Sequence, residues 1–444
     1  MERILLKNAR MVNEGHITEG DLLIEGDRIS RLGKDLSHET ARVIDLEGNY
    51  LLPGLIDDQV HFRQPGLTHK GDIASESRAA VAGGITSFME QPNTVPQTTT
   101  LEKLEEKFEM AAQSAYANYS FLLGGTNDNL EEIKRLDRKA CSGIKLFLGS
   151  STGNMLVDDE VVLERIFRST EMVISAHCED ESTIRRNLAT YMEKYGDDIP
   201  MEYHPAIRSE EACYLSSSRA ISLARSTGAR LHVFHLSTAK EMDLFRNDIP
   251  LSEKKITAEA CIHHLWFSEE DYRTKGSRIK WNPAVKTAAD REKLWEAVLD
   301  DRIDILATDH APHTLEEKQN PYTQCPSGGP LVQHVLPALM EKCLDGVIPL
   351  PTIVQKMCHN PAILFDLDRR GYLREGYFAD LAVVSPNQPW RVSKDNIHYK
   401  CGWSPFEGNE FRSRVLYTFV NGHPAYQLGH FSQVRNARRL TFDR

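Results

Sequence analysis

The 444-residue sequence lacks three features that would each point to a different class of protein. Its eight cysteines are scattered without a C-x-x-C pair, which argues against a disulfide framework. No segment approaches 18 consecutive apolar residues, so no membrane-spanning helix is predicted. The net charge of −11 argues against a nucleic-acid partner, because phosphate binding requires a basic surface. We therefore expect a soluble, cytoplasmic protein with buried free thiols and a small-molecule substrate.

The middle of the chain alternates short apolar runs with helical patterns. Eight runs have the length of buried strands, at about 55–61, 85–92, 118–125, 143–149, 172–178, 230–236, 256–265 and 303–309. Repeated βα units of this length predict a parallel sheet, and eight of them fit a closed (β/α)₈ TIM barrel. An open doubly wound sheet lacks support, because no G-x-G-x-x-G follows the first strand.

The two ends of the chain have a different texture. Short apolar runs separated by turn residues, such as 21–27, 43–49, 379–384 and 415–422, predict antiparallel strands. We expect residues 1–52 and 370–444 to pair into one small β-sandwich, and residues 53–369 to form the catalytic barrel.

Polar residues occur where several predicted barrel strands end. They are His61, Lys145, His177, His235 and Asp309. Barrel active sites lie at this edge, and imidazole and carboxylate groups are standard Zn²⁺ ligands. Taken singly, each histidine could be a satisfied core residue, Lys145 an ion-paired lysine and Asp309 a helix cap. Taken together, they predict a metal site in which Lys145 carries CO₂ as a carbamate and bridges two metals.

These residues resemble the motifs of a known family. Asp57-x-x-x-His61, Gly143-x-Lys145, the single histidines 177 and 235, and the segment 308–313 (Thr-Asp-His-Ala-Pro-His) are similar to those of the amidohydrolase superfamily. Within it, the chain resembles the dihydroorotase, hydantoinase and allantoinase group of cyclic amide hydrolases, including a β-sandwich tail at 371–381. The resemblance implies one or two Zn²⁺ ions, a carboxylated Lys145, and Asp309 as both ligand and proton carrier.

Substrate choice should depend on polar residues other than the ligands. The positions that match the substrate-binding residues of dihydroorotases are Arg63, Asn93, Asn282, His313, Ser327 and Gly328. An arginine can bind a carboxylate through two hydrogen bonds, whereas hydantoinases and allantoinases act on neutral substrates and do not require it. The resemblance therefore favours reversible ring closure of N-carbamoyl-L-aspartate to L-dihydroorotate, a step of pyrimidine synthesis. A salt bridge at Arg63, and ordinary turn roles for the asparagines and for Ser327-Gly328, are the alternatives.

One position departs from the family pattern. The family usually shows His-x-His at the end of the first barrel strand, whereas this chain has Gln59-Val60-His61. Three outcomes follow: both metals bind with the first held more weakly, only the metal of Lys145, His177 and His235 binds well, or the protein is a catalytically silent scaffold. The resemblance also implies a homodimer or a complex with aspartate transcarbamoylase.

Two further segments of the sequence carry hypotheses. The small polar residues 150–154 suggest a lid over the site. His263 and His264 are expected at the end of the seventh barrel strand, in structural roles.

Overall fold

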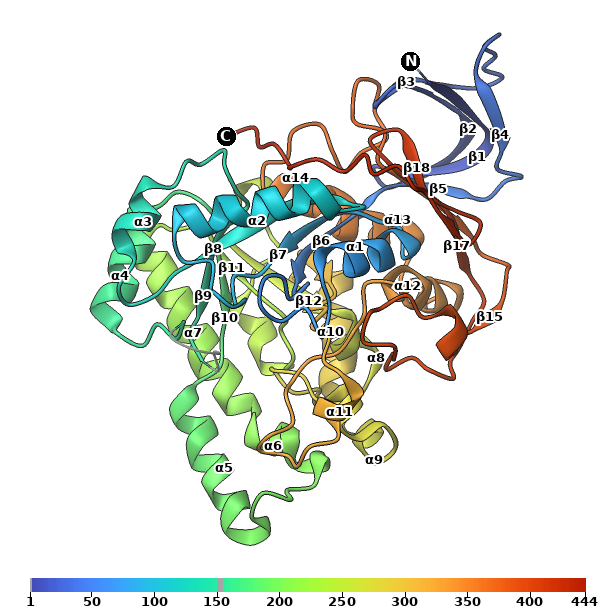
Figure 1. Cartoon of the computed structure of the whole chain (residues 1–444). Coiled ribbons are helices and arrows are strands. Elements are labelled where there is room, and N and C mark those ends of the chain that lie inside the picture. Colours follow the sequence, from blue (N-terminus) through green and yellow to red (C-terminus); the bar gives the residue numbers. More distant parts are fainter. Residues whose placement is uncertain (1, 150–154) are drawn as a thin grey trace.

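The chain folds around a parallel β-barrel, near the centre of Figure 1. A computed structural model describes residues 2–149 and 155–444. Within these residues, eight parallel strands pair in sequence order. They are β6 (Leu55–Val60), β7 (Ile85–Glu90), β8 (Asn118–Gly124), β9 (Gly143–Phe147), β10 (Ile174–His177), β11 (Leu231–Val233), β12 (Ile256–Cys261) and β13 (Ile305–Ala307). The His61 N–H donates to the His310 carbonyl at 2.7 Å, which joins the last strand to the first. The predicted TIM barrel is confirmed.

Helices surround this barrel because each strand is followed by an amphipathic segment. The longer ones are α1 (Ile73–Ala82), α2 (Leu101–Ser114), α3 (Leu130–Arg135), α4 (Glu160–Ser169), α5 (Glu181–Tyr195), α7 (Glu210–Thr227), α10 (Ala288–Leu299) and α12 (Val335–Leu344). Shorter ones are α6 (His204–Ile207), α8 (Ile262–Trp266), α9 (Tyr272–Lys275), α11 (Leu315–Lys318), α13 (Leu350–Val354) and α14 (Asn360–Leu364). Local sequence sets their ends. Asp72 caps α1 by accepting from the Ser75 N–H at 2.7 Å, and Gly228 ends α7 in the left-handed conformation.

One predicted strand is too long. The run 256–265 was expected to be extended throughout, but β12 ends at Cys261 and residues 262–266 form the short helix α8. His263 and His264 therefore lie on a helix, where the His263 ring stacks on Trp281 with 4.4 Å between ring centroids. Short apolar runs do not distinguish a strand from a buried helical turn, so the pattern could not locate this change.

Both termini contribute to a second, mainly antiparallel sheet. Among the described residues it contains β1 (Arg3–Asn13), β2 (His16–Glu25), β3 (Arg28–Gly33), β4 (Arg42–Asp45), β5 (Tyr50–Pro53), β14 (Leu381–Ser385), β17 (Arg414–Val420), β18 (His423–Gln427) and β19 (His430–Phe431). A separate pair, β15 (Trp390–Arg391) and β16 (Glu410–Phe411), lies beside it. The junction is the antiparallel pairing of β5 with β14. Figure 1 shows the blue N-terminal strands beside the red C-terminal ones. The predicted pairing of the two ends is confirmed, and the domain boundaries at 52 and 370 stay predictions.

A buried polar cluster connects this sheet to the barrel. The Asp380 carboxylate pairs with Arg370, accepts from Asn118 Nδ2 on β8 at 3.2 Å, and accepts from the Asn421 N–H at 2.8 Å. Both charged side chains are almost fully buried. Each charge is thus neutralised by a partner, as burial requires.

An apolar layer closes the end of the barrel at which the strands begin, opposite their carboxyl ends. Its members are Ile56, Met89, Leu122, Val173, Ile305, Ala362, Leu364, Phe365, Leu367, Leu440 and Phe442. They come from the barrel strands, from α14 and from the end of the chain. This layer is a closed floor, so access to the barrel interior is from the opposite edge.

Two expectations from composition can be compared with the fold. All eight cysteines are free thiols, and most are buried. Across the described residues, no helix is both long enough and apolar enough to cross a membrane.

Candidate active site

A cavity of about 220 Å³ opens at the carboxyl edge of the barrel strands. It is lined by Gln59, His61, Arg63, Asn93, Lys145, Phe147, His177, His235, Trp281, Asn282, Asp309, Ala311, His313, Pro326 and Ser327. Every residue predicted from the sequence to bind metal or substrate is in this list except Gly328, which follows Ser327. The predicted lid, residues 150–154, lies outside the described residues.

His177 and His235 face each other at the ends of β10 and β11. His177 Nδ1 lies 3.0 Å from His235 Nε2, and both rings are buried. The other nitrogen of His177 donates to Glu179 Oε2 at 2.9 Å, which leaves Nδ1 with a lone pair. Although burial opposes the charged form, Arg208 and His177 lower the pKa of Glu179 to about 2, so it is a carboxylate at neutral pH. Two imidazole nitrogens are therefore held together on one side of the cavity.

Lys145 lines the same cavity as these histidines. Its side chain is 1% exposed, and its Nζ lies 4.1 Å from the centre of the Phe234 ring. Burial lowers the pKa of Lys145 to about 7, although Asp309 opposes that shift. The neutral amine that reacts with CO₂ is thus accessible near neutral pH. A buried lysine beside two neutral imidazoles is the arrangement that a carbamate ligand requires.

His61 and Asp309 form the opposite side of the cavity. His61 Nε2 lies 3.2 Å from Asp309 Oδ1, and His61 Nδ1 lies 2.8 Å from Asn93 Oδ1. Because an amide oxygen only accepts, His61 Nδ1 is protonated and Nε2 carries the lone pair. Burial raises the pKa of Asp309 to about 7, against the opposing charge of Lys145. This carboxyl can therefore take up and release a proton near neutral pH.

Gln59 occupies the position of the missing histidine. Its side chain is buried, lines the cavity, and accepts from Cys261 Sγ at 3.6 Å. The donor set on this side thus consists of one imidazole, one carboxylate and one amide, together with Lys145. An amide oxygen is a weaker ligand for Zn²⁺ than an imidazole, although it can bind harder cations.

Arg63 extends into the cavity without a carboxylate partner. Its Nε donates to the Pro312 carbonyl at 3.0 Å, and its Nη2 lies 3.0 Å from His313 Nε2. The residue is 6% exposed. No carboxylate in the described part of the chain lies within ion-pair distance of it, so the salt bridge considered as an alternative does not form.

His313 lies between two positive charges. Lys70 Nζ lies 3.1 Å from His313 Nδ1, and Arg63 lies at the other ring nitrogen. Burial and then Arg63 hold the pKa of His313 well below its usual value, so the ring is neutral. Lys70 also pairs with Glu317 at 3.0 Å. The resulting cluster makes this wall of the cavity positive.

The loop that carries Ser327 is held by two buried lysines. Lys318 Nζ donates to the Pro326 and Gly328 carbonyls at 2.8 and 2.9 Å, and Lys280 Nζ donates to the Tyr322 carbonyl at 2.7 Å. The Gly328 N–H donates to the Lys280 carbonyl at 2.8 Å. Gly328 thus has internal partners for both backbone groups, and its φ of 127° suits glycine.

Three of the predicted site residues have unusual backbones. Arg63, His235 and Asp309 have φ values of 73°, 40° and 48°, in the left-handed region that non-glycine residues rarely adopt. Such strain concentrates at functional sites, where the surrounding structure fixes it. Here it turns three side chains into the cavity at the points where strands become loops.

Sequence reasoning missed Glu179, Arg208, Lys70 and Lys318. Glu179 had a detectable signal, because it follows His177 by two residues and could face the same way. Lys70 and Arg208 are distant in sequence from His313 and Glu179, the residues that they support, whereas Lys318 lies on a short helix close to its partners Pro326 and Gly328. No periodicity connects them to the site.

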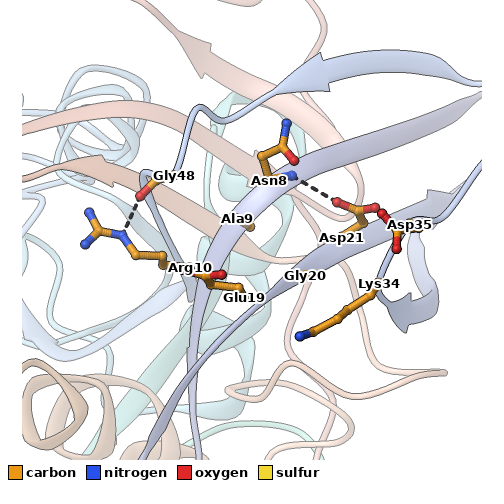
Figure 2. A pocket seen from close by; sticks show the side chains of 9 residues that line it. All are labelled: Asn8, Ala9, Arg10, Glu19, Gly20, Asp21, Lys34, Asp35 and Gly48. Atoms are coloured by element: carbon orange, nitrogen blue, oxygen red, sulfur yellow. Dashed lines mark hydrogen bonds between the residues drawn. The ribbon is translucent and has the colours of Figure 1, made fainter.

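A second hollow lies on the terminal sheet, far from these residues (Figure 2). It has a volume of about 350 Å³ and is lined by Asn8, Ala9, Arg10, Glu19, Gly20, Asp21, Lys34, Asp35 and Gly48. Asp21 accepts from the Asn8 and Leu36 N–H groups, both at 2.9 Å, and Arg10 donates to the Gly48 carbonyl. These polar groups hold the edge of the sheet together, so this hollow is a poor candidate for catalysis.

A sequence profile described as "Amidohydrolase family" matches residues 50–425, which include the barrel and the strands β5, β14 and β17 of the terminal sheet. The chain belongs to the amidohydrolase family. It is 34% identical to a dihydroorotase of Halobacterium salinarum over 406 residues, covering 90% of this chain and 92% of the relative. It is 30% identical to an allantoinase of Bacillus velezensis, with 96% and 94% covered.

The fold of this amidohydrolase is also that of solved relatives. An L-hydantoinase (dihydropyrimidinase) from Arthrobacter aurescens superposes with a TM-score of 0.93 at 27% sequence identity, covering 99% of this chain and 100% of that one. Relatives with different cyclic amide substrates thus share one scaffold. The substrate of this chain has to be argued from its own cavity.

Proposed function

We propose that this amidohydrolase is a dihydroorotase, which interconverts N-carbamoyl-L-aspartate and L-dihydroorotate plus water. The observation that carries the proposal is the buried guanidinium of Arg63, which faces the cavity without a carboxylate partner in the described chain. Asp309, Glu90 and Glu317 act on this guanidinium only from beyond ion-pair distance, so a carboxylate ligand would give the buried charge a direct partner. Dihydroorotate has a ring carboxylate that fits this requirement, whereas hydantoin and allantoin have none.

Arg63, Asn93 and His313 orient the substrate. The guanidinium binds the carboxylate, and the neutral His313 ring lies beside it. The Asn93 oxygen is engaged by His61, so the amide NH₂ is the part that can donate to the substrate. The Ser327 carbonyl oxygen lies 3.1 Å from His313 Nε2, so this backbone borders the same part of the cavity, which Asn282 also lines, and we assign both to contact with the ring. Fixing the ring in this way places its amide carbonyl towards Lys145 and Asp309.

Asp309 transfers the proton. In the hydrolytic direction it takes a proton from the attacking water on its carboxylate and returns it to the ring nitrogen as the amide bond breaks. The pKa of about 7 suits both roles. A divalent cation held by His177, His235 and a Lys145 carbamate would activate the water and polarise the carbonyl. We propose Zn²⁺ as this cation, because two imidazoles and an anionic oxygen are ligands that it favours.

The amide of Gln59 affects how strongly a second cation would bind. We propose that the cation site of His61, Asp309 and the carbamate is weaker than that of His177 and His235, because an amide replaces an imidazole. The remaining candidate residues other than Gly328 line one cavity, which supports an active enzyme over a silent scaffold.

The substrate can be tested with the purified, zinc-loaded chain. We expect turnover of dihydroorotate, and of N-carbamoyl-L-aspartate in the reverse direction, with little turnover of hydantoin or allantoin. Turnover of either neutral substrate in preference to dihydroorotate would overturn the proposal and favour the cyclic amidase alternative.

Assembly has to be considered in this assay. We propose a homodimer, and a complex with aspartate transcarbamoylase as a further form, from the resemblance to dihydroorotases. Light scattering gives the mass of the chain alone. The assay is repeated with the transcarbamoylase, and a fully zinc-loaded chain that is inactive in both conditions would support the scaffold alternative.

A further inference from the structure

Three fully buried side chains converge inside the barrel without lining the catalytic cavity. They are Asp58 on β6, His232 on β11 and Glu259 on β12. One potential ligand atom from each lies within 4.8 Å of the other two. Ser175 is in register with both Lys145 and His232, so these side chains face the same side of the sheet, which is the interior.

The orientation of the His232 ring is fixed by its hydrogen bonds. The Thr257 hydroxyl donates its proton to the Leu231 carbonyl at 3.3 Å, so it accepts from His232 Nδ1, 2.8 Å away. Neutral His232 therefore has its lone pair on Nε2. That atom lies 3.2 Å from Asp58 Oδ2 and 3.7 Å from Glu259 Oε2. Three electron-rich atoms face one another, which is favourable only with positive charge among them.

Both carboxylates present oxygens to this cluster. Asp58 Oδ1, Asp58 Oδ2 and Glu259 Oε2 are buried, and apart from the His232 ring nitrogen they have no hydrogen-bond partner among residues 2–149 and 155–444. Glu259 Oε1 accepts from the His235 N–H at 3.0 Å and from Cys261 Sγ at 3.3 Å, which leaves Oε2 directed to the cluster. Since buried polar atoms normally have partners, these oxygens are well suited to a ligand.

The charge of the cluster favours a divalent ion over a single proton. Two carboxylates and a neutral His232 carry two negative charges in a fully buried space, and a divalent cation balances both. Two carboxylate oxygens and one imidazole nitrogen are donors that Mn²⁺ and Zn²⁺ accept.

We propose that Asp58, His232 and Glu259 bind a divalent transition-metal cation inside the barrel, in a site distinct from the catalytic centre. The site lies above the apolar floor, because the His232 ring contacts Phe365 edge-on with 6.1 Å between centroids. It lies below the cavity, because Cys261 Sγ lies 3.3 Å from Glu259 Oε1 and 3.6 Å from Oε1 of Gln59, which lines the cavity. A cation there fixes Glu259, which in turn holds the backbone of His235 in its left-handed conformation.

The proposal is tested by locating bound Mn²⁺ in crystals of the wild-type chain. The protein is produced in Mn²⁺-supplemented medium, since a fully buried site has to be filled as the chain folds. Anomalous diffraction at the manganese edge should give a peak within bonding distance of Asp58, His232 and Glu259. Density for Mn²⁺ at Lys145, His177 and His235 with none among the three buried residues would overturn the proposal.

Metal counting adds an independent readout. A Lys145→Ala/His177→Ala variant removes two ligands of the proposed catalytic centre, so the metal that it retains reports on the buried site. Adding Asp58→Asn should remove one equivalent per chain, whereas adding Asp57→Asn, the equally buried neighbour on β6, should not. Equal metal content in the two triple variants would contradict the assignment.

Two controls keep this test decisive. If the Asp58 variant does not fold, the anomalous map of the wild-type chain alone decides the outcome. The result is also separable from the proposed function, because dihydroorotate turnover depends on Arg63 and the cavity. Either proposal can fail while the other holds.

Discussion

Arg63 combines a strained backbone with a buried charge, so its removal separates function from stability. Arg63→Met should lower kcat/KM for dihydroorotate roughly 30- to 1000-fold, mainly through KM, because a buried carboxylate partner contributes about 2–4 kcal/mol. The melting temperature should stay the same or rise, since no ion pair of the free protein is lost. Steady-state kinetics and calorimetry measure the two effects, with exposed Arg165→Met as the control. Unchanged kinetics with a lower melting temperature would assign Arg63 a structural role.

Glu179 fixes which nitrogen of His177 faces the cavity. Glu179→Gln should weaken Zn²⁺ binding about 10- to 100-fold, because an amide holds the histidine tautomer less firmly and leaves Arg208 without its carboxylate. Competition with a chelating indicator measures this affinity. Glu181→Gln, on the surface helix α5, is the matched control. Identical Zn²⁺ affinities for the two variants would remove Glu179 from the metal centre.

The residues that sequence could identify share one property. His61, His177, His235 and Asp309 lie at or next to the ends of predicted strands, Lys145 is buried within one, and parallel strands bring their carboxyl ends to one edge. Residues that support them across the fold, such as Arg208, have no such relation to the strand pattern. Nor could the pattern show that Arg63 lacks a carboxylate partner, because that depends on every loop near it.

At the scale of elements, the loop 322–328 depends on α11 through Lys318. Burial lowers the pKa of Lys318 to about 7, whereas an unfolded lysine has a pKa of about 10.4. Between these values the unfolded chain binds more protons, so the free energy of unfolding rises with pH, by at most about 1.4 kcal/mol per pH unit. Below pH 7 both states are protonated and the destabilisation is fully present.

Lys318→Met removes this pH dependence. The free energy of unfolding of the wild type, minus that of the variant, should therefore increase between neutral pH and about pH 10. Urea unfolding across this range measures it, and Lys255→Met, an exposed lysine, is the control. A difference that does not change with pH would mean that Lys318 is charged throughout.

Strand and helix patterns located most elements because barrel strands are buried on both faces. The runs that became β6 to β13 are mostly apolar, and their spacing left room for at least one helix between successive strands. The error at α8 arose where an apolar run continued past the strand end. There the packing of His263 on Trp281, which no local pattern encodes, decides the conformation.

At the scale of the whole molecule, Asp380 connects the terminal sheet to the barrel. Asp380→Ala should destabilise the chain by about 3–5 kcal/mol, because it leaves the buried Arg370 without a carboxylate partner. Chemical denaturation measures the change, and Asp368→Ala, whose ion pair with Arg369 is partly exposed, should cost less than about 1 kcal/mol. Comparable losses for the two variants would show that the cluster does not join the two parts.

The joining of β5 to β14 has a consequence for how the chain acquires its structure during synthesis. The first strands leave the ribosome long before their partner does, and the whole barrel must be made in between. Contacts so distant in sequence carry a large entropic cost and form slowly. One edge of the nascent N-terminal strands therefore stays unpaired until β14 has been synthesised. Chaperones that shield such edges should raise the yield of the native protein.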